Sequence, residues 1–337
     1  MKRWILPPLV VLLAVLILAL ALWPRHSAPQ PAPASPVAID KPVWTQVFTQ
    51  PVRSLVAVDG AVVLGTYQDS CVLPEDGAAT PVAAEPPAED SPWSRTVFAL
   101  AVSPDHSRVY EGRDMAYPVA AFDLQHRNWR TMPAFPDPER WTVWSLAAGD
   151  RLYAGTAKGV WAHALDPDQG AWELLGPPAG QARLPVFSLL DTADGLYAGT
   201  FDGIWRYAGG EWSFLAEAPR GKVFALAQGE WQGRAWRAAG TGDGLFTERA
   251  SGAWQRVEGP YARDPTVYSI AWDPQSGALF AGTTDGVLGL DLAQPSGLPW
   301  RKVGLSGPIM ALAWHDGRFV AGGDGGAFVW EGGRNDA

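Results

Sequence analysis

Apolar residues alternate with small or polar ones in short runs, and these runs return in the same order seven times along the chain. Two clear copies are VWSLAAGDRLYAGTAKGVW, at Val143–Trp161, and VYSIAWDPQSGALFAGTTDGV, at Val267–Val287. Each copy joins a strand-length run to a second run ending in Ala-Gly-Thr, then a third run, and a tryptophan-bearing fourth run follows. Alternation with period two predicts strands. A repeat of about forty residues built from four short strands is typical of a propeller blade.

The first run of each copy predicts the innermost strand of a blade. These runs begin at Val52, Val97, Val143, Val186, Val223, Val267 and Ile309. Their third residue is small in every copy: Ser54, Ala99, Ser145, Ser188, Ala225, Ser269 and Ala311. Their second residue is large in every copy: Arg53, Phe98, Trp144, Phe187, Phe224, Tyr268 and Met310. Because side chains alternate along a strand, we expect the small residues to face the crowded axis and the large ones to pack against a neighbouring blade.

The later runs predict how the ring is packed and closed. The second run ends with a glycine in every copy, which marks a close backbone approach or a bulge: Gly65, Gly112, Gly155, Gly199, Gly240, Gly282 and Gly322. Tryptophans mark seven fourth strands: Trp44, Trp93, Trp129, Trp172, Trp212, Trp254 and Trp300. The last copy stops at Trp330 with three strands, so the early strand at Trp44 completes it and removes an open sheet edge.

The fold predicted is therefore an all-β, seven-bladed β-propeller of four-stranded blades over residues 43–331, with its N-terminal strand closing the last blade. A short tail follows at 332–337. Two departures stand out. Residues 73–91 are rich in Pro, Ala, Asp and Glu and predict a flexible insertion. The second copy replaces Ala-Gly-Thr by Glu111-Gly112-Arg113.

The N-terminus predicts a membrane tether. Residues 4–24 carry no charge and are long enough to span a bilayer as a transmembrane helix. The run exceeds the core of a secretory signal peptide, so we favour an uncleaved signal anchor at 1–26 over a peptide cleaved after Ala19-Leu20-Ala21. Residues 27–42 are rich in proline and alanine and predict an extended linker. Lys2 and Arg3 favour a cytoplasmic N-terminus, which gives a single-pass protein of the cell membrane with an extracytoplasmic propeller.

Charge and cysteine content narrow the function classes. The formal net charge of −9 argues against a nucleic-acid partner, since such proteins need a basic stripe to neutralise phosphates. Cys71 is the only cysteine, so no internal disulfide is expected.

The phrase L-Y-A-G-T-x-x-G-[VI]-W, at Leu152–Trp161 and Leu196–Trp205, resembles the repeats of BNR/sortilin-type propellers. That group includes the photosystem II stability/assembly-factor-like proteins and the sensor propellers of two-component regulators. The phrase SPDHSRVY, from Ser103 to Tyr110, is similar to a turn of YVTN and WD-type repeats. Asp168–Trp172 keeps part of the Asp box of BNR repeats but is one residue short. The resemblance covers about residues 43–331 and implies an architecture shared by many functions.

No catalytic, cofactor or metal constellation is visible in the sequence. A sialidase-like enzyme needs converging arginines and acids near the axis, and only one inner run carries an early arginine, Arg53. The histidines are scattered without the paired spacing of a zinc site, and His315-Asp316-Gly317 is typical of a turn. Walker-type loops and nucleophile elbows are also missing. We therefore expect no enzymatic activity and no cofactor.

Charged and aromatic residues do occur in the segments that link fourth strands to first strands. These segments emerge on one rim of a propeller, where Arg and aromatic residues favour binding. The candidate binding residues are Asp137, Arg140, Trp141, Arg183, Arg220, Tyr261, Arg263 and Asp264. The sequence thus predicts a binding or assembly scaffold for another protein, a small ligand or a glycan. Two alternatives stay open: a degenerate sialidase-like glycosidase or lyase, and an extracytoplasmic sensor that works with a separate signalling partner.

Overall fold

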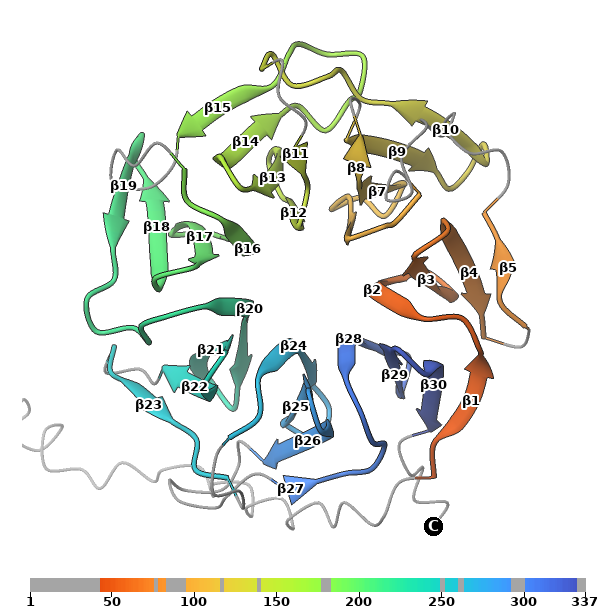
Figure 1. The fold of residues 1–337 in the computed structure, drawn as a ribbon, viewed down its shortest axis with the longest axis vertical. Coiled ribbons are helices and arrows are strands. Elements are labelled where there is room, and N and C mark those ends of the chain that lie inside the picture. The colour runs from red at the N-terminus through yellow and green to blue at the C-terminus, as the bar shows by residue number, and fades with distance from the viewer. Residues whose placement is uncertain are drawn as a thin grey trace, which may run out of the picture. The chain divides into compact units, whose positions relative to one another are not determined.

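Seven four-stranded antiparallel sheets stand around a common axis in the computed structural model (Figure 1). The structure describes residues 43–75, 78–82, 95–115, 118–137, 141–176, 183–248, 252–259, 264–291 and 301–331. The predicted signal anchor, linker and tail (1–26, 27–42 and 332–337) lie outside these residues. Within the described part, no helix is long and apolar enough to cross a membrane.

The strands of each of the first three sheets follow one another in chain order, except that β8 is not part of the second sheet, and the first strand of each is innermost. The first blade comprises β2 (Val52–Val58), β3 (Ala61–Thr66), β4 (Ser70–Pro74) and β5 (Thr80–Pro81). The second comprises β6 (Ala99–Val102), β7 (Arg108–Gly112), β9 (Val119–Asp123) and β10 (Asn128–Thr131). The third comprises β12 (Ser145–Ala148), β13 (Leu152–Thr156), β14 (Gly159–His163) and β15 (Glu173–Gly176).

The remaining four sheets follow the same pattern. The fourth blade comprises β16 (Val186–Thr192), β17 (Gly195–Thr200), β18 (Ile204–Ala208) and β19 (Glu211–Phe214). The fifth comprises β20 (Val223–Trp231), β21 (Arg234–Thr241), β22 (Gly244–Glu248) and β23 (Trp254–Arg256). The sixth comprises β24 (Val267–Asp273), β25 (Ala278–Thr283), β26 (Gly286–Asp291) and β27 (Arg301–Lys302). The seventh comprises β28 (Ile309–His315), β29 (Arg318–Gly323), β30 (Gly326–Glu331) and β1 (Thr45–Phe48).

The ring closes as predicted, because the early strand at Trp44 completes the last blade. β1 pairs with β30 in antiparallel register, with Thr45 opposite Val329. The ring centroids of Trp44 and Trp330 are 5.9 Å apart. The Trp44 Nε1–H donates a hydrogen bond to the carbonyl oxygen of Val303 at 3.0 Å. The edge strand of the last sheet is thus covered by the start of the domain.

The repeated glycine marks a close approach between blades. A Cβ atom at Gly155 would lie 2.2 Å from Ser145 Oγ and 2.8 Å from Val186 Cγ1 of the next blade. Gly199 meets Ser188 and Val223 in the same way. The prediction of a close approach is confirmed, and its cause is the first residue of the following inner strand.

The expected orientation of the small third residues was wrong, whereas four of the large second residues do contact a neighbouring blade as expected. The pairing register of β2, β16, β20, β24 and β28 shifts between the first and third residues, which is the mark of a β-bulge. The extra residue resets the alternation. In β2, Val52 and Ser54 are both buried, and Ser54 Oγ donates to the carbonyl oxygen of Val97 in the next blade at 3.1 Å. The small third residue therefore faces a neighbouring blade, and the large second residue projects from the bulge.

The first two blades differ from the sequence prediction in their outer parts. β4 ends at Pro74 and β5 covers Thr80–Pro81, so strands occupy part of the stretch 73–91 expected to be an insertion. β5 also takes the fourth-strand position that was assigned to Trp93, which lies outside the described residues. A further two-stranded sheet pairs β8 (Asp114–Met115) with β11 (Trp141–Thr142).

Candidate functional site

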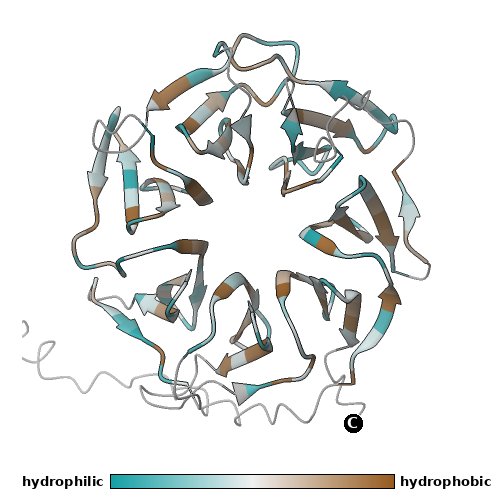
Figure 2. Cartoon of the chain, viewed as in Figure 1, coloured by the Kyte–Doolittle hydropathy of each residue, from teal (hydrophilic) through white to brown (hydrophobic). Residues whose placement is uncertain are grey.

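The second residues of the seven inner runs lie at one end of the axis, where the inner strands begin. Five of them lie at a β-bulge, and Phe98 and Trp144 come directly before β6 and β12. We call these seven residues the channel-mouth ring: Arg53, Phe98, Trp144, Phe187, Phe224, Tyr268 and Met310. Each is partly exposed, whereas the first residue of every inner strand is buried. Figure 2 shows hydrophobic colours where β16, β20 and β28 approach the axis, and a hydrophilic segment in β2.

Four of these side chains form a continuous aromatic arc. The ring centroids of Trp144 and Phe187 are 5.3 Å apart, those of Phe187 and Phe224 5.3 Å, and those of Phe224 and Tyr268 5.6 Å. Each contact joins neighbouring blades. Partly exposed aromatic side chains in contact form an apolar surface with the residue types that dominate binding energy at interfaces.

Arg53 is the one charged member of the ring. Its guanidinium lies 5.4 Å from the ring centroid of Tyr67 and 5.9 Å from that of Phe98. One Nη donates a hydrogen bond to the Tyr67 hydroxyl at 3.2 Å. No carboxylate among the described residues forms an ion pair with Arg53. A guanidinium has five N–H donors, so most of them remain available to an anion.

The structure brings three of the predicted rim residues together in one cluster. Asp137 forms an ion pair with Lys158, whose ammonium lies 5.8 Å from the ring centroid of Trp141. The Arg183 guanidinium lies 5.0 Å from the same centroid. Trp141 itself is only 6% exposed. The indole therefore positions two cations, and it is the cations that meet the solvent.

The other predicted rim residues are dispersed. Arg220 is exposed and stacks 4.4 Å from the centroid of Phe214. Asp264 is buried, and its Oδ2 forms an ion pair with Arg256 Nη2 at 2.9 Å. Its carboxylate therefore already has a partner within the protein. Arg140, Tyr261 and Arg263 lie outside the described residues.

Cation–aromatic contacts concentrate on the face that carries the channel-mouth ring. Among the described residues, the contacts of Arg53, Lys158, Arg183 and Arg220 lie on this face because inner strands begin there and the turns after the second strands end there. Lys222 joins them, 5.0 Å from the centroid of the half-exposed Phe201. Such pairs contribute about 0.5–1 kcal/mol each at exposed sites, and they hold cations ready on a surface.

Sequence reasoning missed the channel-mouth ring because it applied strict alternation to a bulged strand. One signal was present in the repeats. The first position is always Val or Ile, and the third is always Ser or Ala. The second position is usually aromatic but is also Arg53 or Met310. A position packed between blades does not accept an arginine without a partner.

The opposite face carries a cavity of about 570 Å³ on the fifth blade. Its lining includes Glu230, Trp236, Arg237 and Glu248. Arg237 is already committed: its two Nη atoms lie 3.0 Å from Glu248 Oε2 and 3.0 Å from Asp194 Oδ2. The cavity is thus a polar hollow in which Arg237 is neutralised by Glu248 and by the neighbouring Asp194.

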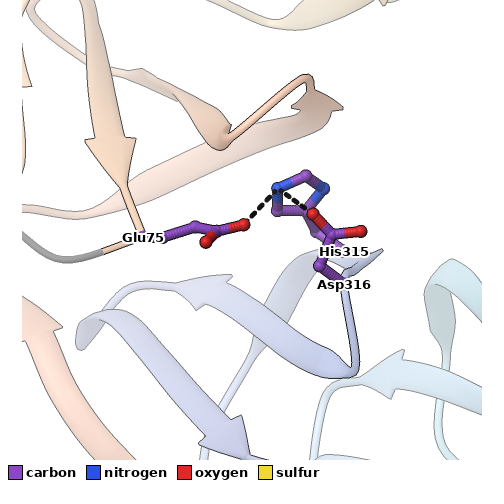
Figure 3. Close-up of side chains that lie close together, drawn as sticks. All are labelled: Glu75, His315 and Asp316. Atoms are coloured by element: carbon purple, nitrogen blue, oxygen red, sulfur yellow. Dashed lines mark ion pairs between the residues drawn. The ribbon is translucent and has the colours of Figure 1, made fainter.

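Figure 3 shows a second group of potential ligands at the junction of the first and last blades. His315 Nε2 lies 3.5 Å from Glu75 Oε1 and 3.4 Å from Asp316 Oδ2. An imidazole and two carboxylates are donors that zinc accepts, but Arg318 Nη2 also lies 3.8 Å from Glu75 Oε1. The cation of Arg318 competes with a metal for that carboxylate. The predicted turn at His315-Asp316-Gly317 is confirmed, since Asp316 and Gly317 form the hairpin turn between β28 and β29.

The departure in the second blade is a buried charged network. Glu111 is fully buried and accepts hydrogen bonds from Arg113 Nη2 at 3.0 Å and Ser70 Oγ at 2.8 Å. Arg113 also donates to Asp69 at 3.1 Å. Burial raises the pKa of Glu111, against the opposing effect of Arg113. With no exposed surface, Glu111 cannot reach a substrate, so this network joins the first and second blades.

Comparison with known proteins shows the fold. No family model matches the chain, and the search of curated proteins found no match. Among solved structures, the extracellular domain of a putative one-component system from B. thetaiotaomicron is similar at a TM-score of 0.67 and 16% identity. That match covers 86% of this chain and 40% of the other. This chain therefore spans less than half of that domain.

Two further structures are similar over nearly their whole length. A chain of the mitotic checkpoint complex matches at a TM-score of 0.67 and 18% identity, over 92% of this chain and 98% of that one. The WD40 repeats of RRP9 match at a TM-score of 0.63 and 13% identity, over 87% of this chain and 99% of that one. This protein is an all-β propeller with seven four-stranded blades. The narrower resemblance to BNR/sortilin-type repeats stays a prediction.

Proposed function

We propose that this protein is a non-catalytic binding scaffold that captures a protein partner on the face carrying the channel-mouth ring. The observation that carries the proposal is the ring itself. Six large apolar side chains and one arginine stand partly exposed at equivalent positions of the seven blades. These side chains stay partly exposed although four of them contact one another between blades, which leaves an apolar surface open to a partner.

The proposal includes the membrane tether and the extracytoplasmic location expected from residues 1–42. It is supported by the similar fold of a domain whose own description is extracellular. The similar fold of a chain that belongs to the mitotic checkpoint complex supports a scaffold role. A sensor that signals through a separate partner is the second candidate. It is supported by the similar fold of the B. thetaiotaomicron extracellular domain, which is described as part of a one-component or a hybrid two-component system. The glycosidase alternative has less support because none of the seven ring residues is a carboxylate.

Site-specific photocrosslinking in the native host tests the proposal. A benzophenone amino acid at Phe187 or Tyr268 places the reactive group in the ring, and the same group at exposed Gln125 lies on the opposite face. We expect a discrete protein adduct from the two ring positions and none from Gln125. Equal adducts from all three positions, or none from the ring, would remove the ring as the partner-binding surface. Protease access to the propeller in intact cells tests the location separately.

A further inference from the structure

The composition of the channel-mouth ring specifies the chemistry of its ligand. Arg53 places one guanidinium in the same ring as the aromatic arc, two blades from Trp144, and its contacts with Tyr67 and Phe98 hold it in place. A ligand that fills this mouth meets an apolar surface and one positive charge. From this juxtaposition we propose that the mouth binds a segment of a polypeptide partner that carries a carboxylate next to an aromatic or large apolar side chain. This inference rests on the proposed function and names the partner's chemistry.

The aromatic arc would bind the apolar side chain of the proposed segment. Trp144, Phe187 and Phe224 contact one another in sequence around the axis. A side chain that lies against the arc would contact more than one ring, since the centroids of neighbouring rings are 5.3 Å apart. Burying such an anchor removes apolar surface from water at about 25 cal/mol per Å². Aromatic partners gain a further contribution from ring contacts.

Arg53 would bind the carboxylate of the proposed segment. Only one hydrogen bond from its guanidinium, to Tyr67, is present in the described structure, and no described carboxylate pairs with it. A carboxylate accepts two parallel N–H bonds from a guanidinium, and charged pairs of this kind are about twice as strong as neutral hydrogen bonds. The same charge disfavours an ammonium ligand on the arc, although aromatic faces alone would attract one.

The surroundings of the mouth favour a polypeptide over a small molecule. Phe201 is 51% exposed with Lys222 above it, and exposed Arg220 lies on the same face. These groups are outside the ring and can only be contacted by something larger than one amino acid. A partner with an acidic and apolar segment would use both the mouth and these flanking cations.

Methionine methyl NMR on the full chain gives a direct test. The sequence has four methionines. Met310 belongs to the ring, and Met132 is 1% exposed in the core of the second blade and serves as an internal control. Replacement Met310→Leu assigns the reporter signal. The probes are N-acetylphenylalanine, its neutral amide N-acetylphenylalaninamide, and phenethylammonium.

We expect N-acetylphenylalanine to shift the Met310 methyl signal at millimolar concentration while Met132 stays fixed. The neutral amide should need about tenfold more, because one charged hydrogen-bonded contact is lost. Arg53→Gln should make the acid and the amide equal, whereas Arg220→Gln, which removes an exposed arginine of the same face, should leave the difference intact. An unmoved Met132 signal shows that the Arg53→Gln chain is folded.

Several results would overturn the proposal. Equal binding of acid and amide to the wild-type chain would mean that the mouth does not recognise an anion. Tighter binding of phenethylammonium would make it a cation receptor. Saturation by N-acetylphenylalanine at micromolar concentration would identify a small-molecule site. A Met310 signal that none of the probes moves would exclude this ligand chemistry, while the crosslinking result would still decide whether the ring contacts a partner.

Discussion

The indole Nε1–H of Trp44 donates a hydrogen bond to the carbonyl oxygen of Val303, 259 positions further along the chain, at 3.0 Å. The fourth-strand tryptophans of other blades do the same toward the blade before them, Trp172 to Pro133 and Trp212 to Leu175. This bond therefore places β1 as a regular fourth strand even though it comes first in the sequence.

Replacement Trp44→Ala should destabilise the ring by about 2–4 kcal/mol, because it removes a large partly buried side chain together with this hydrogen bond. Urea unfolding of the purified chain measures the effect. Val43→Ala is the matched control, since Val43 is 81% exposed and should change stability by less than about 0.5 kcal/mol. Equal stabilities of the two variants would contradict closure by β1.

Replacement Gly155→Ala should cost about 1–3 kcal/mol, because the new methyl group would overlap Ser145 Oγ and Val186 Cγ1. Adding Ser145→Ala and Val186→Ala should recover part of the loss, although Val186→Ala has its own cost. Gly242→Ala is the control, as a Cβ there meets nothing within 4 Å. Thermal unfolding of the three variants decides whether inter-blade contact is the cause.

Two adjacent residues test the bulge. Phe187→Asp should cost about 1–2 kcal/mol, since Phe187 is partly exposed and loses only its two ring contacts. Val186→Asp should unfold the domain or cost more than about 4 kcal/mol, because Val186 is fully buried and an unpaired charge would be placed between blades. Chemical denaturation compares them. Similar large losses for both would show that the second residue is buried between blades as fully as the first.

Arg113→Leu should destabilise the protein by about 3–5 kcal/mol, because it leaves the buried carboxylate of Glu111 without its cation. Adding Glu111→Leu should restore much of the loss. The raised pKa of Glu111 means that the native state holds this proton more tightly than the unfolded state, so stability falls as pH rises above the ordinary glutamate range. That loss of stability should extend to higher pH in Arg113→Leu and vanish in the double variant, as urea midpoints measured at several pH values would show.

Asp194→Asn should remove an acid-dependent part of the stability. Burial acts to raise the pKa of Asp194, but hydrogen bonds from Thr192 and Tyr197 and the charge of Arg237 outweigh it and lower the pKa to about 2. An unfolded aspartate has a pKa near 3.9, so the unfolded state binds more protons between these values. Wild-type stability should therefore fall as pH drops from about 4 to 2, and that of Asp194→Asn should fall less. Exposed Glu211→Gln is the control, and parallel curves for all three proteins would exclude this role of Asp194.

The sequence was sufficient for the architecture because its repeats are regular. The period of the Val-x-small-Leu runs, the repeated glycine and the unfinished copy at Trp330 predict seven blades and their closure, and the pairing of β1 with β30 confirms the closure. The fourth strand of the first blade was misplaced because Thr80–Pro81 has no tryptophan to mark it.

The candidate site was harder to predict for a physical reason. A bulge depends on backbone dihedral angles and pairing register, and neither is visible in the alternation of Val186, Phe187 and Ser188. The rim residues were predicted from their place in linking segments, and three of them do meet around Trp141. Whether a linking side chain is exposed, like Arg220, or paired inside, like Asp264, depends on contacts between distant parts of the chain.

The bulge also separates two kinds of selection. Substitutions at Val186 or Ser188 disturb the packing between blades, whereas a change at Phe187 alters the exposed opening and two ring contacts. The opening can therefore change its specificity at a smaller cost in stability than any change between the blades.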